Sequence, residues 1–152
     1  MIASDAQMAD VPAFLELAAQ VERWFGPMVN EPAFHEALER SIDRGTALCV
    51  RRQDGDGLRG GILFSVRPQL CRINWLVVSH SDRRQGVGEA LVTEAVRRQG
   101  GHGVVEVVTF SVDHPAAQPS GARAFYERLG FKAEEPADAG PDGTPRQWYR
   151  KR

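Results

Sequence analysis

The sequence predicts an α/β domain in which helices pack against one mixed β-sheet. Three observations predict this fold class. The chain has 152 residues, a length typical of one domain that buries about two-thirds of its unfolded surface. Segments with helical periodicity alternate with segments rich in strand-forming residues. One strand is followed by a helix and then by another strand, so a crossover connection between parallel strands is expected.

Composition excludes several classes of protein. Nineteen basic and twenty acidic side chains give a net charge of −1, so no overall charge attracts the chain to nucleic acid or to an anionic membrane. No apolar run approaches the roughly 18 residues of a membrane span, and the first residues lack a secretion signal. We therefore expect a cytoplasmic protein that binds neither nucleic acid nor membranes. Cys49 and Cys71 lack metal-binding spacing and are expected to be reduced thiols.

Two helices are expected near the start of the chain, after a short leader that can hold a ragged first strand. Asp10 caps the first helix, in which apolar residues recur every three or four positions until it ends near Gly26. The second helix begins at Asn30, has a proline in its first turn and ends at Gly45.

The middle of the chain is expected to hold the main strands. Residues 46–52 and 58–67 form an antiparallel hairpin. The turn between them reads Asp54-Gly55-Asp56-Gly57. Residues 72–79 form a third strand, whose apolar end indicates a central and buried position. A helix that ends at Gly100 leads on to a strand at 104–110, which lies parallel to the third strand.

The last part of the chain is expected to hold a helix and a hairpin. Apolar residues at three- and four-residue steps predict a short helix from Ala122 to Leu129, which ends at Gly130. Residues 131–134 and 147–150 form a closing hairpin around a loose loop at 136–145. The exposed hairpin offers an edge for pairing in a homodimer.

A polar loop between the third strand and its helix carries the chemistry. It reads Arg83-Arg84-Gln85-Gly86-Val87-Gly88. The glycines allow the backbone to approach a ligand, and the first amides of the following helix have no intrahelical partner. The helix dipole adds partial positive charge and the arginines add full charges, so the loop is suited to bind a phosphate. A glycine turn with a solvated arginine pair is the alternative interpretation.

Two other phosphate-binding motifs fit this loop less well. A nucleoside triphosphate loop requires a lysine after its glycines, and the chain has only Lys132 and Lys151. A dinucleotide fingerprint requires a third small residue, where this chain has Leu91. Glu106 stands 20 residues after Gly86, as a ribose-binding acid would, but the strand ends several residues before that glycine.

Two motifs of the chain resemble those of one protein family. Leu76-x-Val78 followed by Arg83-x-x-Gly86-x-Gly88-x-x-Leu91 resembles the acetyl-CoA motif of the GNAT family of N-acetyltransferases. The segment 122–131, in which an alanine-rich helix carries Tyr126 and ends in Leu-Gly-Phe, is similar to a later motif of that family. The early helices and hairpin extend the resemblance over nearly the whole chain.

The resemblance implies a mixed, mostly antiparallel sheet of six to seven strands, flanked by about four helices. It also implies that the sheet splays open between the parallel strands at 72–79 and 104–110, and that the cofactor lies in this split. Residues 1–152 would form a single N-acetyltransferase domain, in which both substrates share the one sheet.

By the same resemblance, the chain uses acetyl-CoA as a cosubstrate and needs no metal. The pantetheine arm would pair with the backbone of residues 76–78, as an added strand pairs with an exposed ladder. The pyrophosphate would lie on the amides of residues 84–89. The cofactor-binding residues implied in this way are Leu76, Val77, Val78, Arg83, Arg84, Gln85, Gly86, Val87, Gly88 and Glu89.

The implied reaction transfers an acetyl group to a primary amine of a small molecule or peptide, by direct attack in a ternary complex. Tyr126 resembles the family tyrosine that protonates the leaving thiolate, a role to which a phenol is chemically suited. A packing role beside Phe125 is the alternative. Trp24, Phe25 and Trp75 are candidates either for the acceptor pocket or for the core.

The chain departs from the family pattern at the general base. Neither Arg72 nor Asn74, near the start of the central strand, can accept the proton of the amine. Glu106, Asp113, His114 and a water-mediated path are the open candidates. The missing base motivates a second hypothesis, in which the chain is a non-catalytic acyl-CoA sensor or scaffold of the same fold.

Overall fold

A computed structural model of the chain describes residues 1–55, 57–112, 114–140 and 143–152. Asp56 of the predicted turn, Asp113 and two residues of the predicted 136–145 loop lie outside the described residues. The strands are β1 (Ser4–Asp5), β2 (Ala47–Arg51), β3 (Leu58–Arg67), β4 (Leu70–Val78), β5 (Val104–Phe110), β6 (Lys132–Ala137) and β7 (Arg146–Lys151). The helices are α1 (Val11–Ala19), α2 (Glu22–Phe25), α3 (Pro32–Arg44), α4 (Val87–Gln99) and α5 (Ala122–Arg128).

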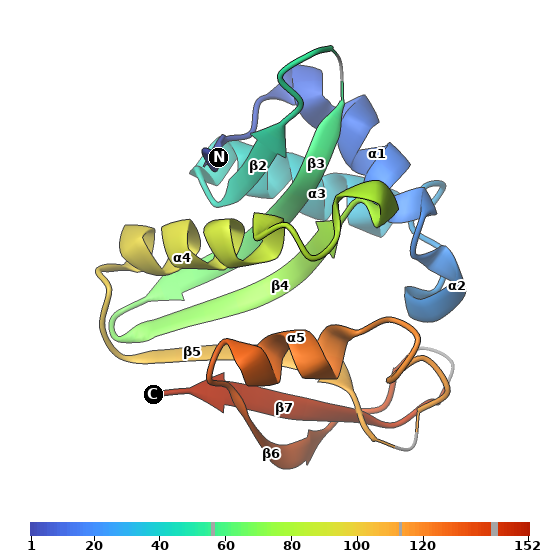
Figure 1. Cartoon of the computed structure of the whole chain (residues 1–152), viewed down its shortest axis with the longest axis vertical. Helices are drawn as coiled ribbons and strands as arrows, with labels where there is room; N and C mark the ends of the chain where they lie inside the picture. Colours follow the sequence, from blue (N-terminus) through green and yellow to red (C-terminus); the bar gives the residue numbers. More distant parts are fainter. Residues whose placement is uncertain (56, 113, 141–142) are drawn as a thin grey trace.

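The described strands form one seven-stranded sheet in the order β1-β2-β3-β4-β5-β7-β6 (Figure 1). Neighbouring strands are antiparallel except β4 and β5, which are parallel because α4 crosses over between them. The mixed, mostly antiparallel sheet confirms the predicted fold class. Among the described residues, no helix is both long and apolar enough to cross a membrane.

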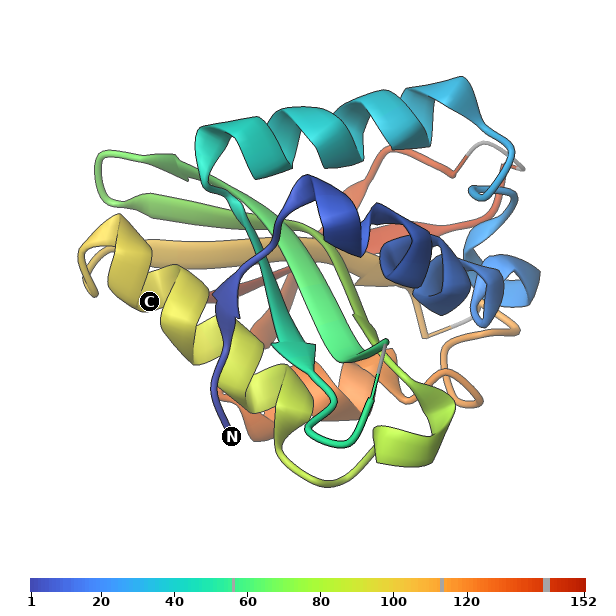
Figure 2. The ribbon, with the colours of Figure 1, turned by 90° about the horizontal axis from the view of Figure 1, so that it is seen from above.

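Helices cover both faces of the sheet (Figure 2). On one face, α1 and α3 bury a cluster that includes Phe14, Leu38 and Val77. On the other face, α4 and α5 bury a second cluster around Leu91 and Tyr126. Each helix therefore places one apolar stripe against the sheet, as the three-to-four-residue periodicity of the sequence predicts.

The first predicted helix is wrong in its length, because it breaks into α1 and α2. Val21 leaves helical geometry (φ −120°) while its side chain is buried in the core. After this break, Trp24 packs against a small cluster at the end of β5, and Phe25 stacks on Phe110 at 4.9 Å. The Glu22 carboxylate then accepts the backbone N–H groups at the start of the next turn. Apolar periodicity continues through the break, so the sequence pattern could not reveal it.

The closing hairpin is longer than predicted and is interrupted. β6 extends through Pro136, and its register with β7 shifts between Ala133 and Pro136. β7 lies between β5 and β6, so β6 is the edge strand, where a proline costs no ladder hydrogen bond. The bulge and the proline oppose pairing of this edge with another chain.

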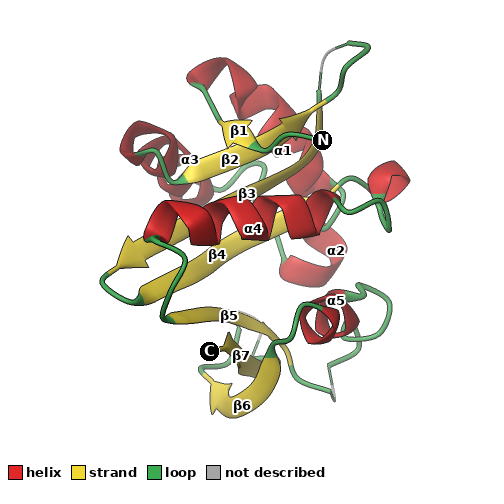
Figure 3. Ribbon diagram, turned by 60° about the vertical axis from the view of Figure 1, so that its left-hand side comes forward, coloured by secondary structure: helices red, strands yellow, loops and turns green. Residues whose placement is uncertain are grey.

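The sheet splits between its two parallel strands (Figure 3). β4 and β5 are in register only from Leu70 with Val104 to Ile73 with Val107. Beyond that point β4 continues along β3 to Val78, whereas β5 continues along β7. Asn74 is an extra residue of β4 relative to β3, and this bulge lies where the split begins. The predicted splay is therefore confirmed.

Candidate functional site

A cavity of about 890 Å³ lies at the split in the sheet. Four segments that are far apart in the sequence form its wall. They are the end of β4, the loop and first turn of α4, the segment from 118 to 129 that includes α5, and α2 with the residue before it. Residues of both sequence motifs therefore line the same cavity, as the resemblance implied.

Nine of the ten residues predicted to bind the cofactor line this cavity. They are Leu76, Val77, Val78, Arg83, Arg84, Gly86, Val87, Gly88 and Glu89. The side chain of Gln85 points instead to β3, where its Oε1 accepts a hydrogen bond of 2.7 Å from Arg59 Nη2. The backbone of 76–78 pairs with β3 on one side and faces the split on the other.

The loop before α4 reaches its shape through two residues in left-handed conformation. Gly86 has φ +85° and stands at the start of α4, with open space around the position of a Cβ atom. Arg84 has φ +63°, which is unusual for a residue with a side chain. The following amides lie at the first turn of a 13-residue helix, where an anion is stabilised.

Gly88 has a packing role that the sequence did not reveal. A Cβ atom at this position would lie 2.8 Å from two ring atoms of Phe125 on α5. The absence of a side chain therefore lets α5 approach the first turn of α4, and it sets the width of the cavity between these helices.

Two arginines beside the cavity lie over the Trp24 ring, and neither has an acidic partner among the described residues. The Arg83 guanidinium lies 5.3 Å from the centre of the Trp24 ring, and the Arg23 guanidinium lies 4.3 Å from the same centre. Burial and the neighbouring charge of Arg23 lower the pKa of Arg83 below its ordinary value. The cavity wall thus carries a partly desolvated positive charge, which favours an anionic ligand.

Tyr126 lies on α5, packs in the core and lines the cavity. The residue is only 6% exposed, and its ring makes edge contacts with Phe125 and Phe131. The hydroxyl has no hydrogen-bond partner within the described part of the chain. No fully buried polar side-chain atom there lacks a partner, so the hydroxyl is not sealed off in the core, and Tyr126 lines the cavity. Burial raises the pKa of Tyr126, so the phenol keeps its proton at neutral pH.

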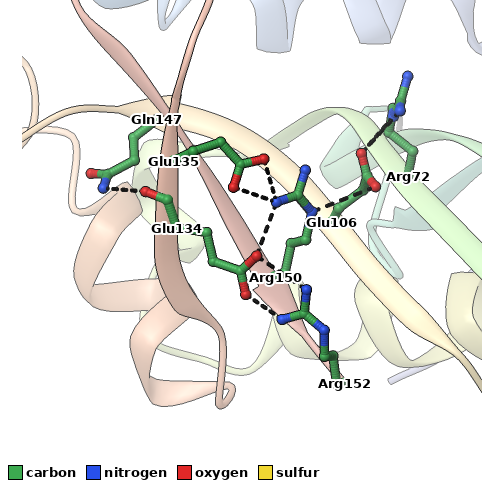
Figure 4. Close-up of polar contacts among 7 residues, drawn as sticks. All are labelled: Arg72, Glu106, Glu134, Glu135, Gln147, Arg150 and Arg152. Atoms are coloured by element: carbon green, nitrogen blue, oxygen red, sulfur yellow. Dashed lines mark hydrogen bonds and ion pairs between the residues drawn. The ribbon is translucent and has the colours of Figure 1, made fainter.

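Glu106 belongs to an ion-pair cluster and not to the cavity wall (Figure 4). Its carboxylate accepts a hydrogen bond of 3.0 Å from Arg72 Nε, and Arg150 Nε lies 3.7 Å away. Arg150 also contacts Glu134 and Glu135 on β6. The pair of Glu106 and Arg72 joins β4 to β5 just before the split. The structure therefore gives Glu106 a structural role at the vertex of the cleft.

His114 is also unsuited to the role of a general base. The ring is buried, and Nδ1 accepts a hydrogen bond of 2.9 Å from the Ala116 backbone N–H. In the neutral ring the proton must then be on Nε2, so neither nitrogen accepts a further proton without breaking this contact. Asp113 lies outside the described residues. Of the two described carboxylates that line the cavity, Asp82 is ion-paired and Glu89 is in the first turn of α4.

Two of the three candidate aromatic residues line the cavity, and the third lies in the core. Trp24 and Phe25 line the cavity. Trp75 instead packs between Phe14 and Phe34 in the core, and its indole N–H contacts the Met28 sulfur at 3.3 Å. The sequence had left both interpretations open for all three aromatic residues.

Comparison with known proteins identifies the family. Residues 43–133, more than half of the chain, match the family model described as an acetyltransferase (GNAT) domain. The chain therefore belongs to the GNAT acetyltransferase family. No curated protein sequence matches the chain.

Solved structures of this family share the fold over nearly the whole chain. A ribosomal-protein-alanine N-acetyltransferase from Brucella melitensis is 18% identical, with a TM-score of 0.73 and 99% of both chains covered. PaiA N-acetyltransferase from Thermoplasma acidophilum, solved in complex with coenzyme A, is 16% identical, with a TM-score of 0.71 and coverage of 99% and 97%. A GNAT acetyltransferase from Bacillus cereus is 12% identical, with a TM-score of 0.72 and coverage of 99% and 95%.

Proposed function

We propose that residues 1–152 form one N-acetyltransferase domain that transfers an acetyl group from acetyl-CoA to a primary amine of a small molecule or peptide. One observation carries the proposal. The split in the sheet brings the free side of β4, the first turn of α4 and Tyr126 to the same cavity. The enzyme would act in the cytoplasm, without a metal ion.

The residues of the cavity fit acetyl-CoA in three respects. The β4 edge at 76–78 is suited to pair with an extended pantetheine arm. The first amides of α4, with Arg83 and Arg84 beside them, are suited to hold a pyrophosphate. The similar PaiA structure contains coenzyme A, which supports the same ligand class here.

The reaction needs few groups from the protein. The amine nitrogen attacks the thioester carbonyl carbon, the new C–N bond forms, and the C–S bond breaks as sulfur takes the electron pair. Tyr126 donates its proton to the leaving thiolate, and water returns a proton to the phenolate. Glu106 and His114 are held in other contacts, so the attacking nitrogen loses its proton to water or to Asp113, which lies outside the described residues. Positioning of both substrates in one cavity supplies the main catalytic advantage.

A non-catalytic acyl-CoA sensor or scaffold is the second candidate function. It is favoured by the engagement of Glu106 and His114 in structural contacts, which leaves the amine without a protein base among the described candidates. The two functions differ in one product. An acetyltransferase releases free coenzyme A thiol when an amine acceptor is present, whereas a pure binder releases none.

Calorimetric titration of acetyl-CoA tests the proposal first, followed by thiol release across a broad panel of amines. Binding with acceptor-dependent thiol release is expected, and no binding at high micromolar acetyl-CoA would refute both functions. Gly86→Ala is expected to weaken binding, because its methyl group would enter the space of the pyrophosphate. Gly45→Ala is the matched control, since Gly45 is also left-handed and unobstructed but ends α3, away from the cavity.

A further inference from the structure

A buried carboxylate joins the loop before α4 to the β2–β3 hairpin. Asp82 is only 7% exposed and lies between two arginines. Arg52 Nη2 donates to Asp82 Oδ2 at 2.7 Å, and Arg59 Nε donates to Asp82 Oδ1 at 3.0 Å. Arg52 follows β2 directly and Arg59 is on β3. Both arginines therefore come from the hairpin, and they precede Asp82 by 30 and 23 residues along the chain.

Arg59 also contacts the far end of the same loop. Its Nη2 donates to Gln85 Oε1 at 2.7 Å, while its backbone carbonyl accepts the Ser79 N–H at 2.8 Å. One residue of β3 thus bonds to positions 79, 82 and 85. Gln85, which stands apart from the cavity wall, is explained by this bridge.

The loop needs such support because its backbone is strained. Arg84 is held at φ +63° between Asp82 and Gly86, a left-handed conformation that is unfavourable for a residue with a side chain. Such conformations persist only where the surroundings enforce them. The loop also presents amides to an anion, and amides fixed before binding hold it more tightly than amides that must first be ordered.

One carboxylate faces two guanidinium groups in this bridge. Burial alone would raise the pKa of Asp82, but the hydrogen bonds from Arg52 and Arg59 outweigh burial and lower its pKa below the usual value. Asp82 is therefore ionised at neutral pH. Both of its carboxylate oxygens are already occupied by the arginines, so it is suited to anchor the loop and not to accept a substrate proton.

We propose that Arg59 is a positioning residue for the binding of the phosphate end of acetyl-CoA. It acts through Asp82 and Gln85 and does not contact the ligand. This inference rests on the proposed function. The guanidinium of Arg59 is directed to Asp82 and Gln85. Its effect reaches the ligand through the conformation of residues 82–86, which fixes the amides at the start of α4.

The proposal separates the two ends of the ligand. Arg59→Gln should raise the calorimetric Kd for coenzyme A about tenfold, as expected when charge-assisted hydrogen bonds are lost. The affinity for pantetheine, which has no phosphate and pairs only with β4, should stay unchanged in an NMR titration. Hydrogen exchange should become faster at residues 79–89 and stay the same in α3. The Kd of Arg59→Lys for coenzyme A should lie between those of wild type and Arg59→Gln, because one ammonium group cannot bridge Asp82 and Gln85 together.

Two further variants keep the test decisive. Gln85→Leu removes only the exposed half of the bridge, so it should fold even where Arg59→Gln does not, and it should also weaken coenzyme A selectively. Arg51→Gln is the matched control. Arg51 lies on the same hairpin, but it pairs with Asp10 at 2.7 Å and not with the loop before α4. The Kd of this variant for coenzyme A should therefore equal that of wild type. Unchanged coenzyme A binding in Gln85→Leu, or an equal loss for pantetheine, would overturn the proposal. Failure of the wild-type chain to bind coenzyme A would instead refute the proposed function.

Discussion

Replacement of Tyr126 by phenylalanine separates the chemistry of the hydroxyl from the packing of the ring. The ring contacts with Phe125 and Phe131 remain in the variant. No hydrogen bond within the described residues is lost, because the hydroxyl has no partner there. The free energy of unfolding should therefore change by less than about 1 kcal/mol. If the hydroxyl protonates the leaving thiolate, turnover should fall by roughly 10²- to 10⁴-fold.

The assay follows free thiol with a chromogenic disulfide under saturating acetyl-CoA and an accepted amine. The Kd for acetyl-CoA, measured by calorimetry, should stay within about twofold of wild type, because the ring contacts that hold α5 in place are unchanged. Burial raises the pKa of Tyr126, so the phenol remains protonated and should cause no loss of activity between pH 7 and pH 9. The pH profile of the wild-type enzyme checks this point.

Tyr149 provides a matched control, since the chain has only two tyrosines. Tyr149 is fully buried on β7, and its hydroxyl lies 3.5 Å from Glu127, away from the cavity wall. Tyr149→Phe should keep full turnover. Full turnover in Tyr126→Phe would show that another group protonates the thiolate, and equal losses in both variants would show a general packing effect.

Three further changes test other parts of the structure. Glu106→Gln should lower the free energy of unfolding, measured in urea, by about 1–3 kcal/mol, because it breaks the ion pair with Arg72. Unchanged stability, together with loss of the acidic limb of the pH profile of activity, would instead indicate that Glu106 is a general base. Gly88→Val should cost about 1–3 kcal/mol in the same assay, because its side chain overlaps the Phe125 ring; equal stability would contradict the close helix contact. Hydrogen bonds from Arg152 and then Arg150 lower the pKa of Glu134 from 4.5 to about 2, so its contribution to stability is present above pH 4.5 and is lost as pH falls toward 2. Urea midpoints at pH 6 and pH 3 should therefore differ less in Glu134→Gln than in wild type.

Much of the fold could be predicted from local sequence signals. The strands β3 and β5 have the predicted bounds, because each is a run of strand-forming residues that begins directly after a glycine, and a proline follows β3. The parallel pair also followed from the sequence, since a helix between two strands of one sheet makes a right-handed crossover. The break between α1 and α2 could not be predicted, because it depends on the distant end of β5 that Trp24 and Phe25 contact.

The sequence by itself determined the family, the two motifs and the order of elements, because glycines, prolines and apolar periodicity act over a few neighbouring residues. Only the tertiary structure decided what the charged residues do. Asp82 lies among polar neighbours in the sequence, yet its partners Arg52 and Arg59 come from the distant β2–β3 hairpin. Glu106 is a candidate base in the sequence, but in the structure it forms an ion pair with Arg72. This pair links the two parallel strands β4 and β5. Ionic partners are chosen by distance in space, and sequence spacing carries no record of that distance.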